Sequence, residues 1–304
     1  MDLRGLLLDS CYYMYQLSDC CTNDFVAHNS SSTTHAASCR WYHSVWQYLR
    51  ILDCVSSPQW HQSFYEKEIV ASLASCKTHI SILISGTADY SLLYLIVNVI
   101  KKYKSPEQNV SIDVVDLCET PLQICKWYIS KEEVNGGIYN IAISYYKSNI
   151  GLFDRGKKYD MICTDAFLTR FSSYETTSIV SKWYNLLCTG GKIITTVRIH
   201  ERTDNRASLV GQIKDINLFL SKIQDRFQRL PVEDVVKMNT SLDELSFMAL
   251  RYIIRMKSNN IGDVSEIKRL FEQANLMPLS TQVATVPGEI KETTYCRIVA
   301  QRGA

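Results

Sequence analysis

The sequence predicts an α/β fold in which helices cover both faces of a mostly parallel sheet. The first observation is that short apolar runs alternate with helical segments from residue 79 onward, with short turns between them. The second is that the first of these runs, HISILIS at residues 79–85, is a short apolar run, which is typical of a buried parallel strand. The third is the length of 304 residues, which is enough for one large core and an appendage. We therefore expect a core over residues 77–304 and a helical region over residues 1–76.

Five strands are expected in the first part of the core, at residues 79–85, 110–115, 140–144, 160–164 and 192–198. Helices should connect them. One covers residues 91–102, and the next begins at Thr120-Pro121, because proline in the first helical turn lacks only a donor that the helix does not need. A later helix should begin at the capping box Ser172-x-x-Glu175 and end at Gly190-Gly191.

Residues 206–257 interrupt this alternation and are expected to be a helical insertion. Their apolar residues recur at steps of three and four, which predicts an amphipathic helix: Leu209, Ile213, Ile216, Leu220, Ile223 and Phe227. Pro231 should end it, and a second helix should begin at Ser241-x-x-Glu244. The core then resumes with a helix at residues 263–274 and two closing strands at residues 279–286 and 295–300.

The helical region over residues 1–76 is rich in aromatic side chains, including Tyr12-Tyr13, Trp41-Tyr42 and Trp60. Aromatic residues on helices usually pack against one another, since each ring buries a large apolar area. This region and the insertion nevertheless stand on either side of the expected cleft in the sequence. We expect the two to form a helical lid over that cleft.

The composition of the chain limits which partners and which cellular compartment we expect. Lys and Arg number 33 against 31 Asp and Glu, and no basic stripe suggests a nucleic-acid partner. The N-terminal segment MDLRGLLLDS does not resemble a secretory signal, and the run Leu92–Val97 is too short to span a membrane. The eleven cysteines include no C-x-x-C pair or zinc-binding spacing, so we expect reduced cysteines, no metal site and a cytoplasmic protein.

Small or polar residues follow the ends of four predicted strands. They are Gly86-Thr87-Ala88-Asp89, Asp116, Asn149, and Asp165-Ala166-Phe167. In an open α/β sheet, ligands bind at the carboxyl ends of the strands. Small residues let a backbone approach a ligand, and a carboxylate accepts hydrogen bonds from ribose hydroxyls. The order of these residues therefore predicts a cofactor pocket at this edge.

The segments ILISGTADYS, VVDLCETPL, YDMICTDAF and LLCTGGKIITTVR together resemble the class I (Rossmann-like) S-adenosylmethionine-dependent methyltransferase family. The segments FEQANLMPLS and TTYCRIVAQR are similar to the last helix and closing antiparallel hairpin of that family. The resemblance covers about residues 79–200 and 263–301. It implies a three-layer Rossmann-like sheet, S-adenosylmethionine as the cofactor, and methyl transfer as the activity.

The resemblance assigns the cofactor to residues that follow strand ends, namely Gly86, Thr87, Ala88, Asp89, Asp116, Leu117, Pro121, Asn149, Ile150, Asp165, Ala166 and Phe167. It implies that Gly86 and Asp89 border the methionine part, that Asp116 holds the ribose, and that Asn149 lies near the adenine. Two departures from the family pattern stand out. The glycine-rich loop keeps only Gly86, and Asn149 stands where an acid often follows the third strand.

The acceptor is expected to be a small molecule. The fourth strand ends in DAFL, and so lacks the Asn/Asp-Pro-Pro-aromatic segment of methylases that act on DNA bases or glutamine. His200, in VRIHER just past the fifth strand, is the candidate general base for a hydroxyl acceptor. Two other functions stay open. The pattern Gly86-x-Ala88-x-x-Ser91 also suits a nicotinamide-dependent oxidoreductase, and a degenerate loop suits a non-catalytic S-adenosylmethionine-binding module.

Overall fold

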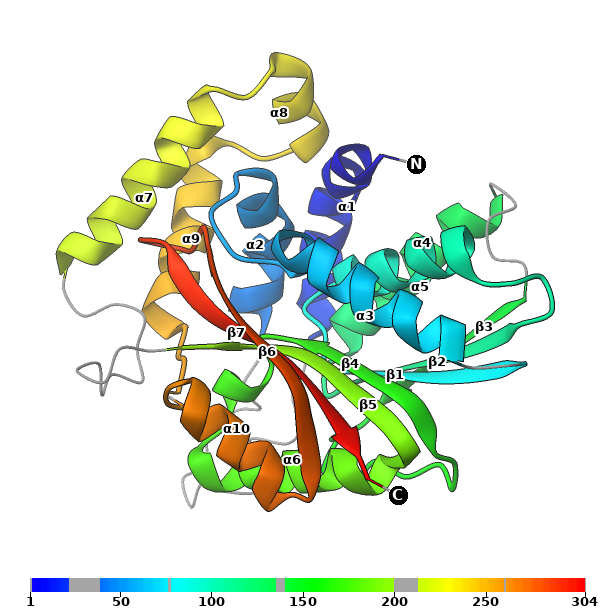
Figure 1. Ribbon diagram of the computed structural model, residues 1–304. Coiled ribbons are helices and arrows are strands. Elements are labelled where there is room, and N and C mark those ends of the chain that lie inside the picture. Colours follow the sequence, from blue (N-terminus) through cyan, green and yellow to red (C-terminus); the bar gives the residue numbers. More distant parts are fainter. Residues whose placement is uncertain are drawn as a thin grey trace.

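A seven-stranded sheet with the order β3-β2-β1-β4-β5-β7-β6 forms the centre of the molecule (Figure 1). The computed structural model describes residues 2–21, 39–75, 78–134, 140–199, 213–259 and 261–303. The strands are β1 (His79–Ser85), β2 (Asn109–Asp116), β3 (Ile141–Lys147), β4 (Tyr159–Asp165), β5 (Leu187–Arg198), β6 (Leu276–Val286) and β7 (Thr293–Arg302). The first five are parallel, and β7 runs antiparallel between β5 and β6.

Helices cover both faces of this sheet, so the expected three layers are confirmed (Figure 1). On one face lie α3 (Gln62–Ser75), α4 (Ser91–Tyr103) and α5 (Glu119–Val134), whose apolar residues share a core cluster with Ile82 and Ile112. On the other face lie α6 (Ser173–Leu186) and α10 (Val264–Gln273), which pack with Leu83 and Ile162. Successive strand residues point to opposite faces, and every residue of β1 after His79 is buried, so both faces of this strand are covered.

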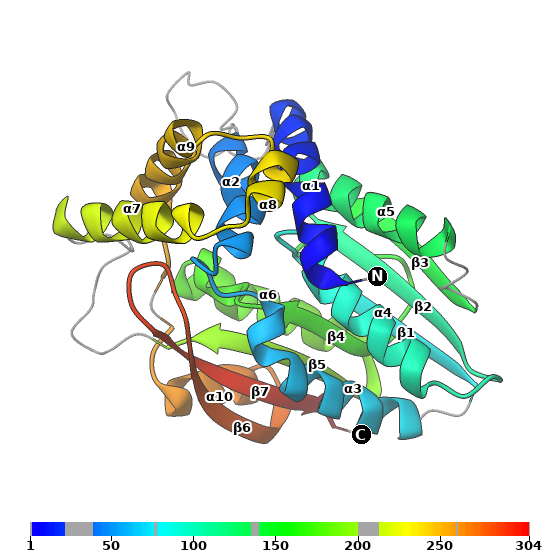
Figure 2. The same ribbon diagram turned by 90° about the horizontal axis from the view of Figure 1, so that it is seen from above.

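The N-terminal helices and the insertion pack together, although they are far apart in the sequence (Figure 2). They are α1 (Leu3–Leu17), α2 (Arg40–Ile51), α7 (Ile213–Gln228), α8 (Val232–Met238) and α9 (Leu242–Arg255). Tyr252 of α9 is the centre of their contact, with its ring centroid 5.8 Å from Tyr42, 6.3 Å from Trp41 and 6.2 Å from Phe219. Aromatic packing of this kind buries a large apolar area and holds α2, α7 and α9 as one unit.

Most of the predicted elements are confirmed, with boundaries shifted by a few residues. Both capping boxes are present, because Ser172 and Ser241 each exchange hydrogen bonds with the glutamate three residues later. The insertion holds one helix more than expected, since Pro231 is also the N-cap of α8. Leu209, which was expected at the start of the amphipathic helix, lies outside the described residues.

The prediction that a helix ends at Gly190-Gly191 is wrong. Helix α6 ends at Leu186, and β5 begins at Leu187 and runs through both glycines. The pairing of β5 with Tyr159 shifts register at this point, and Gly190 has a φ of +78°. The glycines therefore form an irregularity inside a strand, where a left-handed backbone and a close neighbouring strand both favour glycine.

No helix within the described ranges combines the length and the apolar character that a bilayer span needs.

Two glycine substitutions test the placement of Gly190-Gly191 inside β5. A Cβ at Gly191 would lie 2.9 Å from the carbonyl oxygens of Cys188 and Tyr159, so Gly191→Ala should lower the free energy of unfolding by about 1–3 kcal/mol. Gly5 lies inside α1 with no heavy atom within 4 Å of that position, so Gly5→Ala should raise it by roughly 0.5–1 kcal/mol. Urea unfolding of both variants measures the two effects. Equal stability of the two variants would contradict this description of the strand.

Candidate functional site

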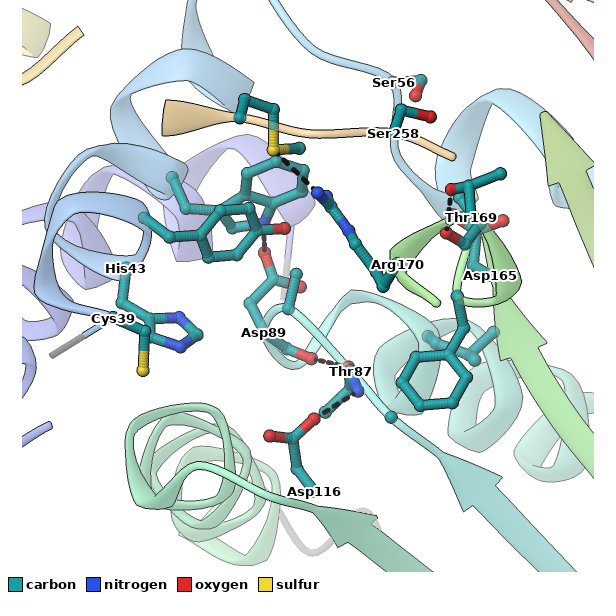
Figure 3. Close-up of a pocket in the computed structure, with 18 of the residues that line it drawn as sticks. Cys39, His43, Ser56, Thr87, Asp89, Asp116, Asp165, Thr169, Arg170 and Ser258 are labelled. Carbon is teal, nitrogen blue, oxygen red and sulfur yellow. Dashed lines mark hydrogen bonds between the residues drawn. The ribbon is translucent and has the colours of Figure 1, made fainter. Parts of the chain in front are cut away.

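A pocket of about 360 Å³ lies at the carboxyl ends of β1, β2 and β4 (Figure 3). The sheet order reverses between β1 and β4, because β2 lies on one side of β1 and β4 on the other. Open α/β sheets bind ligands at such a switch point, since the loops of the two halves separate there. Residues from α2 and from the end of the insertion close the outer side of the pocket.

The loop after β1 is built around Gly86. Its φ of +74° lies in the left-handed region, and its N–H donates to the Val115 carbonyl at 2.8 Å. A Cβ at this position would overlap the ring of Phe167, which lies across the pocket floor. Both the conformation and the close approach therefore require glycine. The result is a stretch of bare backbone that faces the pocket.

Asp116 ends β2 and presents a carboxylate to the same pocket. Its Oδ2 accepts the N–H of Thr87 at 2.9 Å, and its Oδ1 accepts the N–H of Cys118 at 2.7 Å. Burial raises the pKa of Asp116 to about 6, and the backbone donors oppose that rise. Each oxygen can accept further hydrogen bonds, so the ionised group can still receive donors from a ligand.

Asp89 lines the pocket, but both oxygens of its carboxylate bind groups of the protein and hold the loop in place. Arg50 Nη1 lies 2.5 Å from Oδ2, and both side chains are 2% exposed. Trp46 Nε1 donates to the same oxygen at 3.0 Å, and the N–H of Ser91 donates to Oδ1 at 2.7 Å. Arg50 also donates to Gln59 Oε1 at 2.7 Å. The β1–α4 loop is therefore tied to α2 through a buried ion pair.

The loop after β4 forms the opposite wall. Asp165 Oδ1 accepts the hydroxyls of Tyr65 at 2.9 Å and Thr196 at 2.7 Å, which fixes its orientation. Ala166 has a φ of +50°, and its N–H donates to Thr196. The next ring, Phe167, is packed edge-on against Phe171 with a centroid distance of 4.8 Å. This wall thus combines a fixed carboxylate with an apolar ring.

The outer part of the pocket carries charges of both signs beside aromatic rings. Arg198 at the end of β5 lies 3.5 Å from Glu289, and Tyr252 donates to the other oxygen of Glu289 at 3.2 Å. Arg170 donates to the Lys257 carbonyl at 3.1 Å, and its guanidinium lies 5.4 Å from the Tyr42 ring centroid. Of these residues, Tyr42, Arg170, Arg198 and Glu289 line the pocket.

The structure brings together nine of the residues that the resemblance assigned to the cofactor. Those that line the pocket are Gly86, Thr87, Ala88, Asp89, Asp116, Leu117, Asp165, Ala166 and Phe167. Three others do not line it. Pro121 is buried in α5, Ile150 is buried in the core, and Asn149 accepts the Gly151 N–H at 2.9 Å in its own turn. His200 lies outside the described residues.

Several pocket residues were not predicted as site residues. Trp46 and His43 come from α2, and burial lowers the pKa of His43 to about 4, so its imidazole is neutral. Arg50 was also missed. It does not line the pocket itself, but it stands four residues after Trp46 on the buried face of α2, and an arginine on a buried helix face is the signal that could have revealed a buried partner. Of the aromatic groups noted in the sequence, Trp41 and Tyr42 line the pocket, whereas Trp60 lies partly exposed outside its lining.

The buried Arg50–Asp89 pair can be tested by its effect on stability. Arg50→Met should lower the free energy of unfolding by roughly 3–5 kcal/mol, because Asp89 is left as an unpaired buried charge. Adding Asp89→Asn should recover part of that loss. As a control, Arg229→Ala removes the partner of Asp225 in an exposed pair and should change stability by less than about 1 kcal/mol. Urea unfolding compares the three, and a small loss for Arg50→Met would contradict the role given to the pair.

Solved structures with a similar fold were found, whereas no protein-family model and no curated protein matches the sequence. The structure of a possible exported protein from Bordetella parapertussis aligns over 97% of this chain and 79% of its own, with 11% identity and a TM-score of 0.50. The magnesium protoporphyrin IX methyltransferase of Synechocystis, with bound SAM, aligns over 81% of each chain with 10% identity and a TM-score of 0.45. The N-methyltransferase NodS of Bradyrhizobium japonicum, with S-adenosyl-L-homocysteine, aligns over 86% of this chain and 99% of its own, with 9% identity and a TM-score of 0.44.

At these identities the likeness concerns the fold. The strand order, the five parallel strands and the antiparallel β7 agree with the architecture that the sequence resemblance implied. The chain therefore has the three-layer, Rossmann-like fold of the class I methyltransferases.

Proposed function

We propose that this protein is an S-adenosylmethionine-dependent methyltransferase that acts on a small-molecule acceptor. The observation that carries the proposal is the pocket at the switch point, where the Gly86 turn, the Asp116 carboxylate and the Phe167 ring converge. Each of the three comes from a different strand end. Together they offer backbone that lines the pocket, an anionic acceptor and an apolar surface, which suit the amino-acid, ribose and base parts of this cofactor.

Two features of the pocket fit that cofactor. The first is the Gly86 turn, where the lack of a side chain lets the Phe167 ring pack against the backbone, and we propose that the methionine part lies along Thr87 and Ala88. The second is the remaining hydrogen-bonding capacity of Asp116, which can accept the two ribose hydroxyls. Asp89 keeps the loop in place through Arg50, and we assign it no direct contact with the cofactor.

In this reaction the main task of the protein is to align the acceptor with the methyl group of the cofactor, and acid–base catalysis is secondary. When bound, the cofactor supplies a methyl group on a positively charged sulfur, which is already a good electrophile. The rings of Trp41, Tyr42 and Phe167 exclude water from the pocket, while Arg170, Arg198 and Glu289 provide polar contacts that orient an acceptor. Reaction then requires that the acceptor atom be held in line with the methyl group.

The size of the site favours a small acceptor over a polymer. A volume of about 360 Å³ lies within the usual range for small-molecule sites, roughly 300–1,000 Å³. The formal net charge of +2 gives no general attraction for a polyanion. Glu289 and the arginines of the outer pocket suit an acceptor that carries both donor and acceptor groups.

A general base is needed only for a hydroxyl acceptor, because amines and thiolates react without one. His43 is a poor candidate, since burial lowers its pKa to about 4. We keep His200 as the proposed base because it follows β5, whose last residue Arg198 lines the pocket.

We also propose that the helical parts of residues 1–76 and 206–257 act as a lid. The contact of α2 and α9 through Tyr42 and Tyr252 places them together at the outer side of the pocket. We also propose a cytoplasmic location, because seven of the described cysteines are free and such thiols suit a reducing compartment, whereas Cys21 and Cys118 are joined by a disulfide.

Asp116 links cofactor affinity to pH. Its pKa of about 6 lies above the ordinary value of 3.8, so the carboxylate is present above pH 6 and is lost as the pH falls through that value. Affinity for S-adenosylmethionine should therefore weaken between pH 7 and pH 5. Asp116→Asn should weaken binding at pH 7.5 by roughly 10–100-fold, as expected for lost charge-assisted hydrogen bonds, and should show no such pH dependence. Isothermal titration of both proteins, with the surface variant Asp154→Asn as a control, measures this. Unchanged affinity in Asp116→Asn would remove Asp116 from the site.

The function itself is tested by two experiments on the full chain. Titration with S-adenosylmethionine, S-adenosylhomocysteine and NAD⁺ should show binding of the first two only. Incubation with cofactor labelled in the methyl group and a small-molecule extract of the native host should then give a labelled product. Binding of NAD⁺ alone would favour an oxidoreductase. Binding of S-adenosylmethionine with no transfer to any extract fraction would favour a non-catalytic binding module.

A further inference from the structure

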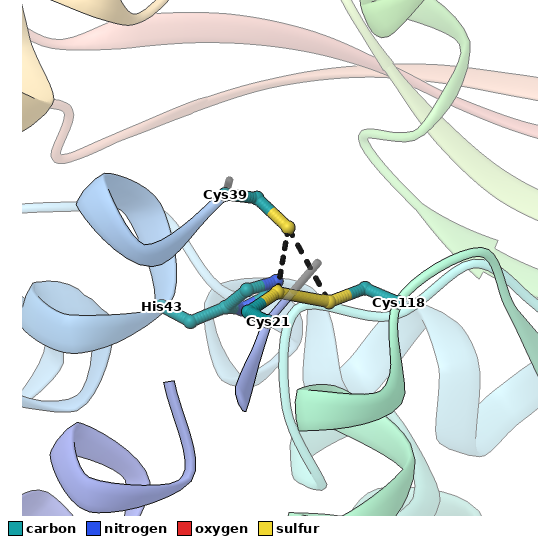
Figure 4. Close-up of side chains that lie close together, drawn as sticks. All are labelled: Cys21, Cys39, His43 and Cys118. Atoms are coloured by element: carbon teal, nitrogen blue, oxygen red, sulfur yellow. Dashed lines mark hydrogen bonds between the residues drawn. A yellow bond between two sulfur atoms is a disulfide. The ribbon is translucent and has the colours of Figure 1, made fainter. Parts of the chain in front are cut away.

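Three cysteines and one histidine converge next to the pocket (Figure 4). Cys21 follows α1, Cys39 is the N-cap of α2, His43 lies in the first turn of α2, and Cys118 follows β2. Their three sulfurs and one imidazole nitrogen all lie within 4.8 Å of one another. The sequence analysis did not predict this cluster, because its members are spread over about 100 positions.

The structure joins Cys21 to Cys118 by a disulfide, so the expectation that every cysteine is reduced is wrong for these two. A disulfide explains only half of the cluster. Cys39 Sγ lies 2.7 Å from Cys21 Sγ and 3.3 Å from Cys118 Sγ, so a third sulfur touches both members of the bond. His43 Nδ1 is buried and has no hydrogen-bond partner among the described residues. Buried polar nitrogens are normally satisfied, so this one indicates a missing partner.

A zinc ion would account for all four groups. Structural zinc sites are tetrahedral, commonly with three cysteines and one histidine, and Zn–S and Zn–N bonds of about 2.3 and 2.0 Å put neighbouring ligand atoms roughly 3.5–3.8 Å apart. The four groups already lie in a cluster of that size. Cys39 needs to move from the other sulfurs by only about 1 Å or less to reach these spacings.

We propose that the chain with these cysteines reduced binds one Zn²⁺ through Cys21, Cys39, His43 and Cys118. The three thiols give up their protons on binding, and the neutral imidazole donates a nitrogen lone pair. Four protein ligands leave no open position, so the ion is structural and takes no part in methyl transfer. The proposal is independent of the proposed function, since metal binding can be measured without cofactor or acceptor.

The site would tie the helical region to the cofactor pocket. Cys21 and Cys39 belong to the segments on either side of residues 22–38, and Cys118 lies in the loop after β2. The N–H of Cys118 donates to Asp116 at 2.7 Å, and Cys39, His43 and Cys118 all line the pocket. A metal at this point would therefore fix the backbone that orients the Asp116 carboxylate.

Metal analysis of the full chain tests the proposal. The protein is reduced with a phosphine, which gives two electrons to the disulfide and is oxidised to its phosphine oxide, and is then incubated with Zn²⁺ and desalted. We expect about one zinc per chain by elemental analysis. Replacement by Co²⁺ should give the sulfur-to-cobalt charge-transfer bands and intense visible bands of a tetrahedral thiolate site. After denaturation with a chelator, all eleven cysteines should react as thiols, against nine for a chain that keeps the disulfide.

Single substitutions assign the ligands. Cys39→Ser and His43→Gln should each weaken zinc affinity by at least about 10-fold and change the cobalt spectrum. Cys188→Ser is the matched control, because Cys188 is also partly buried but lies on β5 with its thiol 3.5 Å from Asp160, and it should bind zinc as the wild type does. A reduced protein that takes up no zinc, a cobalt spectrum without thiolate bands, or full affinity in Cys39→Ser would each overturn the proposal. The Cys39→Ser result also separates a zinc site from a simple disulfide, which does not need Cys39.

Discussion

The pocket depends on the buried ion pair between Arg50 of α2 and Asp89 of the β1–α4 loop. Asp89 also receives Trp46 and the backbone of Ser91, so the loop that follows the first strand is held by a helix from outside the sheet. Such a pair contributes little net stability, because burying both charges costs about as much as their attraction returns. Its main effect is on geometry, since the bare backbone at Gly86 stays where a ligand can approach it.

The same arrangement divides the carboxylates of the pocket by role. Asp89 receives the side chains of Arg50 and Trp46, and Asp165 receives the hydroxyls of Tyr65 and Thr196, so side chains from other elements hold both carboxylates. Asp116 is held by backbone N–H groups alone, so its side chain keeps the capacity to bind a ligand. Helix α2, which supplies Arg50, also supplies Trp41 and Tyr42 to the pocket lining, so one helix both orients the loop and lines the pocket.

The sequence predicted the sheet well because each strand is a local feature. The run at residues 79–85 coincides with β1, and the capping boxes at Ser172 and Ser241 are complete in the structure. Gly190-Gly191 was misplaced, since a glycine pair marks a helix end and a strand irregularity equally well, and only the register with Tyr159 decides between them.

The site was predicted only where it follows the strands. Asp116 and Phe167 line the pocket because a strand end fixes their position, whereas Asn149 turns back onto its own loop. Arg50 and Cys21 depend on contacts between segments that are distant in the sequence, and no local pattern specifies which buried partner they meet. The spacing Cys39-x-x-x-His43, one helical turn, was the one local sign of the cysteine–histidine cluster.

The central claim is that the switch-point pocket holds S-adenosylmethionine by its ribose. A crystal structure of the full chain grown with S-adenosylhomocysteine tests it most directly. We expect both ribose hydroxyls within hydrogen-bonding distance of Asp116 and the amino-acid end of the ligand beside Gly86. Ligand bound elsewhere, or bound in this pocket with its ribose away from Asp116, would contradict it.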